Sequence, residues 1–563
     1  MSSILTTRPS WVLRSSLREL TSPIPSLPFT LSRLYQYLEL GSRFQCHLSS
    51  KNTSHHSVRY SRTSAISFPC VDQHEARSAI ILESKQESKS NGSSGLADQN
   101  LGVNASRAHS RTEQASVGPE PHYSRLTSGY QIYHHPHRFQ LNYGQSLSEF
   151  DIAYETWGNL SEKRDNVILL HTGLSASSHA KSHDQNLTPG WWEQFMGHGS
   201  KFPIDLDRYF VICTNVLGSC YGSTGPSSPN PATGEPYATH FPIITIFDMV
   251  AAQFLLLDHL GIDRLYASIG SSMGGMQSIA AAWMRPDRVE KVVSISGCGR
   301  SAPSSIALRY AQRSVLMADP NWNRGFYYHH LPPHVGMKLA RQIATITYRS
   351  GPEWEQRFGR RRQMMRSNED QNDAKSISAP VLCPDFLIET YLDHQGEQFC
   401  LKYDANSLIY VSKAMDLFDL TFEGLAHITA FRSQENLPTG NQNHPDPSCS
   451  PSSNLVPFET IVSQTIQETE RSKTHVSSLP NPNLGLVESL SKTFQSLKHH
   501  PILILGAQSD ILFPIHQQRE LAEAMRLAGN KNVIYYELDS PYGHDTFLID
   551  LAGVGSAIRG FLS

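Results

Sequence analysis

Short apolar segments rich in β-branched residues recur along the chain and alternate with longer segments of helical character. The apolar segments are NVILLHT (166–172), YFVICTN (209–215), LYASIG (265–270), KVVSISG (291–297), PILILGA (501–507) and VIYYELD (533–539). Between the second and the third lies IFDMVAAQFLLLDHLG (246–261), which is long enough for a helix. Nearly continuous apolar strands that alternate with helices are typical of a parallel sheet buried on both faces. The pattern predicts an α/β fold with a mostly parallel sheet between two layers of helices.

Two segments between the early and the late strands differ from this pattern. Residues 301–430 are amphipathic, and we expect them to form helices that lie over the sheet as a lid. Residues 431–495 are rich in Ser, Pro and Asn, and we predict a low-complexity insertion whose role the sequence does not indicate. The predicted sheet domain therefore has two parts, residues 126–300 and residues 496–563.

The N-terminal region has a composition of its own. Residues 1–50 contain five arginines, two acidic residues and many serines, and they lack a continuous apolar core. This composition is typical of a mitochondrial transit peptide, so the mitochondrial matrix is the predicted location, with an ordinary disordered tail as the alternative. Residues 51–125 are polar with few apolar clusters and are predicted to be a disordered linker.

Charge, hydropathy and cysteine content argue against several kinds of partner, membrane segment and metal site. The chain of 563 residues has a net charge of −3 and no basic stripe with interleaved aromatic residues, so no nucleic-acid partner is expected. The sequence contains no run of about 18 apolar residues, so no membrane span is predicted. The eight cysteines are scattered and form no CxxC pair, which argues against a disulfide framework or a zinc site and fits a reducing compartment. No metal or bound prosthetic group is predicted.

The segment GSSMG (270–274) joins a predicted strand to a predicted helix and matches the pattern G-x-S-x-G. A nucleophile on such a turn has a strained backbone, so its neighbours must be small. The turn also presents the hydroxyl at the start of a helix, where the helix dipole favours negative charge. An ordinary tight turn would use small residues too, but the strand–motif–helix context favours Ser272 as a nucleophile.

A serine nucleophile needs a base, which a carboxylate in turn orients. In α/β-hydrolases the carboxylate and the histidine follow the serine in that order, after late strands. Asp510 follows the predicted strand 501–507, and His544 follows the predicted strand 533–539. We therefore predict a triad of Ser272, Asp510 and His544. A helix-capping aspartate and a turn histidine are the alternatives.

An oxyanion hole is expected on a loop after an early strand. The segment LLHTGLSASSH (169–179) overlaps the end of the first predicted strand, and its Gly173 allows close backbone approach. The candidate donors are the backbone amides of Leu174 and Met273. An ordinary Gly/Ser turn is the alternative.

Several longer motifs resemble the homoserine O-acetyltransferase family. They are GSSMGGMQ, NVLGSCYGSTGPSSPNPATG, YLDHQGEQFCLKYDANSLIYVSKAMDLFDL, SDILFP and GHDTFL, and the resemblance covers about residues 130–430 and 496–563. It implies an α/β-hydrolase fold with a helical lid, often dimeric. It also implies a ping-pong reaction in which Ser272 accepts the acyl group of an acyl-CoA co-substrate. The hydroxyl of an amino acid then takes the acyl group, with His544 as base.

The resemblance also implies an amino-acid pocket. The arginine in KLARQIAT is Arg341, and the aspartate after the histidine is Asp545. Arg341 is expected to bind a carboxylate through its planar guanidinium, and Asp545 to bind an ammonium group. A salt bridge within the lid and a helix cap are the respective alternatives.

The chain departs from the homoserine pattern at the elbow, which begins Gly270-Ser271 rather than Gly-Gly, in the loop HTGLSASSH, and in residues 340–360. These variants resemble the serine O-acyltransferase branch, which includes serine O-succinyltransferases and fungal mitochondrial enzymes that feed cysteine synthesis. Arg309 stands where the homoserine enzymes carry an uncharged residue. It is expected to pair with the distal carboxylate of a succinyl group, which favours succinyl-CoA slightly over acetyl-CoA. The alternative is a solvated arginine on a helix face.

Three other functions remain as alternatives. A homoserine O-acetyltransferase of methionine synthesis would use the same triad, and one methylene is worth only about 1–3 kcal/mol of discrimination. An esterase would use water as the acceptor, against which the Arg341 and Asp545 pair and the GSTGPSS loop argue. A non-enzymatic scaffold would not need to keep all three triad residues.

Overall fold

The structure is a computed structural model of the whole chain, and it describes residues 127–362, 382, 384–435 and 482–563. The predicted transit peptide, residues 1–50, lies outside the described residues. So does the predicted linker, residues 51–125. Among the described residues, no helix is both long and apolar enough to cross a membrane.

An eight-stranded sheet forms the centre of the molecule, in the order β1-β4-β8-β5-β9-β10-β11-β12. From β8 to β12 all neighbours are parallel, whereas β1 and β4 add an antiparallel edge. The six parallel strands are those predicted: β5 (Val167–His171), β8 (Phe210–Thr214), β9 (Leu265–Ser271), β10 (Val289–Ile295), β11 (Ile502–Ala507) and β12 (Val533–Leu538). The α/β-hydrolase fold class is confirmed by this sheet.

The antiparallel edge was not predicted. It consists of β1 (Gln131–His135) and β4 (Phe150–Trp157), whose sequences mix polar with apolar residues. Two short ladders, β2 (Phe139–Gln140) with β3 (Ser146–Leu147) and β6 (Met196–Gly197) with β7 (Ile204–Asp205), lie outside the main sheet. Antiparallel strands need no continuous apolar run, and β1 also has one neighbour fewer, so the search for such runs finds neither strand.

Both faces of the sheet are buried at its centre, where successive residues of one strand enter different cores, whereas the outermost parallel strand β12 exposes Ile534 and Tyr536, so the predicted burial on both faces is wrong there. Val167 and Leu169 of β5 join the core formed with α3 (Ile246–His259), α4 (Met273–Met284) and α13 (Ile515–Leu527). Ile168 and Leu170 enter the opposite core, with α15 (Gly553–Leu562) and the aromatic residues Trp192 and Phe195. The side-chain period of two in a strand thus divides one apolar run between two layers.

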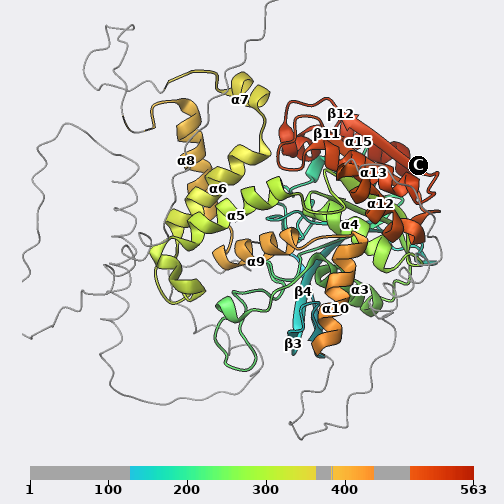
Figure 1. Ribbon diagram of the computed structural model, residues 1–563, viewed down its shortest axis with the longest axis horizontal. Coiled ribbons are helices and arrows are strands. Elements are labelled where there is room, and N and C mark those ends of the chain that lie inside the picture. The colour runs from blue at the N-terminus through green and yellow to red at the C-terminus, as the bar shows by residue number, and fades with distance from the viewer. Residues whose placement is uncertain (1–126, 363–381, 383, 436–481) are drawn as a thin grey trace, which may run out of the picture. The chain divides into compact units, whose positions relative to one another are not determined.

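Further helices lie between β10 and β11 in the sequence. They are α5 (Pro303–Met317), α6 (His334–Tyr348), α7 (Gly351–Arg357), α8 (Leu387–Cys400), α9 (Ala405–Asp416), α10 (Phe422–Glu435) and α12 (Pro482–Thr493). Helix α6 packs between α5 and α8 (Figure 1). Helices α5, α6, α8 and α9 contribute to a third core that includes Leu316, Phe399 and Tyr403 together with Tyr221, which follows β8. The segment predicted as a lid therefore contacts a loop at the carboxyl edge of the sheet.

The predicted insertion, residues 431–495, is longer than the segment between helices α10 and α12, which spans residues 436–481. Helix α10 continues to Glu435, and α12 packs Val487 and Leu490 into the same core as Leu425 of α10. Helical structure resumes at residue 482 rather than 496, and α12 supplies apolar side chains to the core from Val487 onward. Residues 436–481 lie outside the described residues.

The turn from β9 to α4 leaves no space for side chains at two glycines. A Cβ atom on Gly270 would overlap the backbone carbonyl of Gly274, and one on Gly274 would overlap the carbonyl oxygen of His171. Because backbone atoms form these contacts, they cannot move aside as a flexible side chain does.

We expect Gly270→Ala to lower the free energy of unfolding by about 1–3 kcal/mol or more, as overpacking does. Gly560→Ala is the matched control, because a Cβ atom there meets nothing within 4 Å. In helix α15 this change should be neutral or stabilise by up to about 1 kcal/mol. Urea unfolding of both variants measures the difference, and equal effects would contradict the role assigned to the turn.

Candidate active site

Ser272 occupies the turn between β9 and α4 with φ 59° and ψ −123°, a conformation that non-glycine residues rarely adopt. Its amide donates a hydrogen bond to the carbonyl oxygen of Ile295 at 2.8 Å, which ties the turn to β10. The hydroxyl makes no capping hydrogen bond to α4, although Ser272 is the N-cap residue. Local strain thus holds the hydroxyl away from its own helix.

The three predicted triad side chains lie in one hydrogen-bonded chain. His544 Nε2 lies 2.7 Å from Ser272 Oγ, and His544 Nδ1 lies 2.6 Å from Asp510 Oδ2. All three residues are buried. Because the carboxylate accepts the Nδ1 proton, Nε2 is left to accept the hydroxyl proton of Ser272. The geometry is that of a serine nucleophile with its general base.

Other groups fix the two partners of Ser272. The second oxygen of Asp510 accepts hydrogen bonds from the amides of Leu512 and Phe513, at 2.9 and 2.8 Å. The ring of Phe513 stacks on His544 with centroids 5.0 Å apart and planes 14° apart. Phe547 contacts the same imidazole edge-on at 5.4 Å. The imidazole therefore has little freedom to turn away from Ser272.

The candidate oxyanion donors follow the ends of two neighbouring strands, β5 and β9. His171, the last residue of β5, pairs with Gly270 of β9, so the following loops leave the same edge of the sheet side by side. A Cβ atom on Gly173 would lie 4.0 Å from the carbonyl oxygen of Ser271. The carbonyl of Leu174 accepts a hydrogen bond from Tyr403 at 2.8 Å, which fixes the loop. Within the described part of the chain, the amides of Leu174 and Met273 donate no hydrogen bond.

Arg341 lies on α6 with its guanidinium over two aromatic rings. The centroids of Phe399 and Tyr348 are 4.4 and 5.1 Å from its central carbon. Its Nε is buried without a hydrogen-bond partner among the described residues, and no described carboxylate forms a salt bridge with it. The alternative of a salt bridge within the predicted lid is therefore not observed.

Asp545 lies beside His544 in a short 3-10 helix (Gly543–Asp545) and forms an ion pair that was not predicted. Its Oδ2 lies 3.1 Å from Nη2 of Arg349, whose Nη1 also contacts Glu353 at 2.5 Å. Burial raises the pKa of Asp545, and the positive charges of Arg349, His544 and Arg341 oppose that rise. The alternative of a helix cap is not observed, because the side chain makes no capping hydrogen bond.

Arg349 is the residue of this site that the sequence analysis missed. It lies within the variant segment 340–360, but no spacing connects it to Asp545, which lies nearly 200 positions later. The adjacent Ser350 donates a hydrogen bond to the carbonyl of Pro541, so the start of α7 is joined to the loop before His544. Only the folded structure reveals this contact.

Arg309 is buried, with 2% of its surface exposed, so the alternative of a solvated arginine is wrong. Its Nε lies 2.6 Å from Asp416, which also pairs with Arg313 at 2.5 Å. Its Nη1 is buried without a hydrogen-bond partner among the described residues. The guanidinium lies 5.9 Å from the ring of Phe513, the ring that stacks on His544. One aromatic ring thus separates this cation from the imidazole.

Comparison with known proteins agrees with this geometry. A family model described as the alpha/beta hydrolase fold matches residues 166–551. A serine O-succinyltransferase of Emericella nidulans is 53% identical over 516 residues, which are 90% of this chain and 89% of that protein. One of Schizosaccharomyces pombe is 49% identical and covers 88% of this chain and 94% of its own. The chain belongs to the serine O-succinyltransferase family.

Family membership confirms the resemblance described from the motifs and its serine branch. A solved homoserine O-acetyltransferase from Bacillus anthracis superimposes with a TM-score of 0.58 at 23% identity. It covers 77% of this chain and 98% of its own length, and at this identity it shows a shared fold alone.

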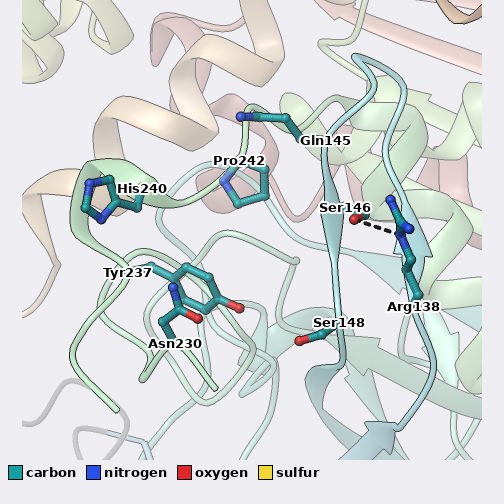
Figure 2. A pocket seen from close by; sticks show the side chains of 8 residues that line it. All are labelled: Arg138, Gln145, Ser146, Ser148, Asn230, Tyr237, His240 and Pro242. Carbon is teal, nitrogen blue, oxygen red and sulfur yellow. Dashed lines mark hydrogen bonds between the residues drawn. The ribbon is translucent and has the colours of Figure 1, made fainter. Parts of the chain in front are cut away.

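A cavity of about 620 Å³ lies apart from these residues, between the β2–β3 ladder and residues 230–242 (Figure 2). Figure 2 shows Arg138 donating a hydrogen bond to Ser146 on one wall, with Tyr237 and His240 on the other. No residue of the candidate active site lines it. We therefore place the chemistry at Ser272 and not in this cavity.

We expect a fluorophosphonate probe to label the protein at Ser272. Ser272→Ala should abolish the labelling, and Asp510→Asn should slow it by about 10⁴-fold, because His544 then loses the carboxylate that sets its tautomer. Ser271→Ala is the matched control. The hydroxyl of Ser271 is buried without a hydrogen-bond partner among the described residues, so its loss should leave the labelling rate unchanged. Mass spectrometry locates the label, and unchanged labelling of Ser272→Ala would exclude Ser272 as the nucleophile.

Proposed function

We propose that the protein transfers a succinyl group from succinyl-CoA to the hydroxyl of L-serine through an acyl-enzyme on Ser272. The observation that carries this proposal is the hydrogen-bonded chain Ser272–His544–Asp510, which is suited to acyl transfer. The relatives are serine O-succinyltransferases, which supports serine as acceptor and succinyl as the acyl group.

In the first half-reaction Ser272 attacks the thioester carbonyl. His544 Nε2 takes the hydroxyl proton as the C–O bond forms, and the amides of Leu174 and Met273 stabilise the oxyanion. When the tetrahedral intermediate collapses, the C–S bond breaks and His544 returns the proton to the thiolate. The products are free CoA and an ester on Ser272.

In the second half-reaction the serine hydroxyl attacks that ester. His544 takes the proton of the incoming hydroxyl and gives it to Ser272 Oγ as the acyl–enzyme bond breaks. The product is O-succinyl-L-serine, and the enzyme returns to its starting protonation state. No metal, redox group or bound cofactor takes part in these steps, and acyl-CoA enters as a co-substrate only.

The acceptor would bind between Arg341 and Asp545. Nε of Arg341 is buried without a hydrogen-bond partner among the described residues, which supports a role of this guanidinium in binding the carboxylate of serine. The ammonium group would pair with Asp545, which in the ligand-free protein pairs with Arg349. Because Asp545 follows His544 directly, binding of the acceptor there brings its hydroxyl towards the base.

The donor would be selected by Arg309. Two arginines, Arg309 and Arg313, share one carboxylate, that of Asp416, so this buried group carries an excess positive charge. Buried charges are normally paired, and a distal carboxylate on the acyl group would supply the missing partner. Acetyl-CoA carries no such carboxylate and would leave Nη1 of Arg309 unpaired.

We further propose that the enzyme acts in the mitochondrial matrix, in the synthesis of cysteine, and as a homodimer. The arginine-rich, acid-poor composition of residues 1–50 supports the location. Exposed Tyr310, Leu339 and Ile346 on α5 and α6 support self-association of these helices.

The direct test is a two-by-two assay of the purified chain, with acetyl-CoA or succinyl-CoA and L-serine or L-homoserine. We expect the fastest CoA release with succinyl-CoA and L-serine, O-succinylserine as the product by mass spectrometry, and no turnover by Ser272→Ala. O-acetylhomoserine as the main product would assign the protein to methionine synthesis. Equal CoA release without an amino acid would indicate a hydrolase, and no turnover would indicate a scaffold.

The role of Arg309 predicts a change of donor preference. Arg309→Met should lower kcat/KM for succinyl-CoA by about 10-fold to 100-fold, since a hydrogen bond to a charged group is worth about 1.5–3 kcal/mol. The value for acetyl-CoA should change little. Arg313→Met is the matched control, because it removes the other ion pair of Asp416 and leaves Nη1 of Arg309 available. An equal loss with both donors would show a structural role only.

A further inference from the structure

We propose that Glu155, His179 and His183 form a binding site for a divalent transition-metal cation, with Zn²⁺ as the expected ion. Glu155 comes from β4, and both histidines lie on the segment that follows β5. Their side chains are 1%, 7% and 19% exposed, respectively. The site stands apart from the triad, and the proposal does not rest on the proposed function.

The three donor atoms converge on one point. Glu155 Oε2 lies 2.8 Å from Nδ1 of His179 and 2.8 Å from Nε2 of His183. The potential ligand atoms of all three residues lie within 4.8 Å of one another. The two imidazoles are 5.6 Å apart with planes 65° apart, so both rings direct a nitrogen at the same oxygen. Two histidines and one carboxylate are an established zinc ligand set.

The surrounding groups orient the ligands as metal sites require. His179 Nε2 donates a hydrogen bond to the carbonyl oxygen of Thr188 at 2.7 Å, which leaves Nδ1 to face the carboxylate. Ser178 Oγ donates to the other oxygen of Glu155 at 2.8 Å. A histidine that binds a metal usually donates its second N–H to a carbonyl or a carboxylate. These outer contacts therefore already hold Glu155 and His179 in a ligating orientation.

The number of histidines favours a ligand site over a simple ion pair. An ion pair alone would need one histidine, whereas here a second imidazole is directed at the same oxygen.

The site is accessible on one side. A cavity of about 240 Å³ is lined by Glu155 and His183, together with Asp184 and Gln185. Water from this cavity can complete a four-coordinate shell, and the Asp184 carboxylate adds negative charge to the entrance. The bound ion would join β4 to the segment that begins at Gly173 and includes Leu174. Its expected effect is to hold that segment against the sheet.

The test uses the full chain after removal of metal with a chelator. Isothermal titration with Zn²⁺ should show one more high-affinity equivalent in the wild type than in His183→Asn. Affinity at that site should fall by at least about 10-fold in the variant. His198→Asn is the matched control, since it removes an exposed histidine that pairs with Asp207 but is not part of the cluster. It should bind Zn²⁺ like the wild type, and only these two proteins should gain melting temperature with the metal.

A second measurement keeps the proposal testable if His183→Asn folds poorly. X-ray absorption of the zinc-loaded wild type should show two imidazole ligands with oxygen neighbours. Equal zinc binding by the wild type and a folded His183→Asn would overturn the proposal, as would no binding by the wild type. A zinc shell with fewer than two imidazoles would indicate surface binding and would overturn it too.

Discussion

The site depends on a single backbone constraint, the close contact between β9 and α4 at Ser272. Gly270 and Gly274, on either side of Ser272, lie so close to backbone carbonyls that a side chain would not fit at either position. Ser272 between them takes a strained conformation with a positive φ. The amide hydrogen bond to Ile295 fixes this turn to the next strand. The strained backbone keeps the Ser272 hydroxyl from capping its own helix. The hydroxyl is held instead where it can hydrogen-bond to His544.

Parallel register then assembles the rest of the reacting groups. The strands β5, β9, β10, β11 and β12 all end at one edge of the sheet, so the segments that follow them meet there. Asp510 and His544 are separated by an entire helix in sequence, yet they hydrogen-bond because β11 and β12 are neighbours. Position after a strand end, together with the chain order serine, aspartate, histidine, therefore predicted that these side chains meet.

Other features could not be predicted, for identifiable physical reasons. The antiparallel strand β4 mixes polar with apolar residues, and α12 is a short apolar run beside a polar segment, so neither resembles a buried parallel strand or a long helix. The Arg349–Asp545 pair and the approach of Glu155 to His179 join residues with no shared motif. Such pairings arise only when separate elements pack. The buried state of Arg309 was also not settled by sequence, because arginine on an amphipathic helix is usually exposed.

The strands of the sheet and the helical segment between β10 and β11 supply different residues to the site, and this separation has an evolutionary consequence. The reacting groups follow strands of the sheet, whereas Arg309, Arg341 and Arg349 come from the segment between β10 and β11. Under the proposed function, substitutions of these arginines would change the charges offered to donor and acceptor without touching the strained turn at Ser272. Specificity would then be open to mutation in a region that does not carry this backbone constraint. Selection would act on specificity there while the Ser272–His544–Asp510 chain is inherited unchanged.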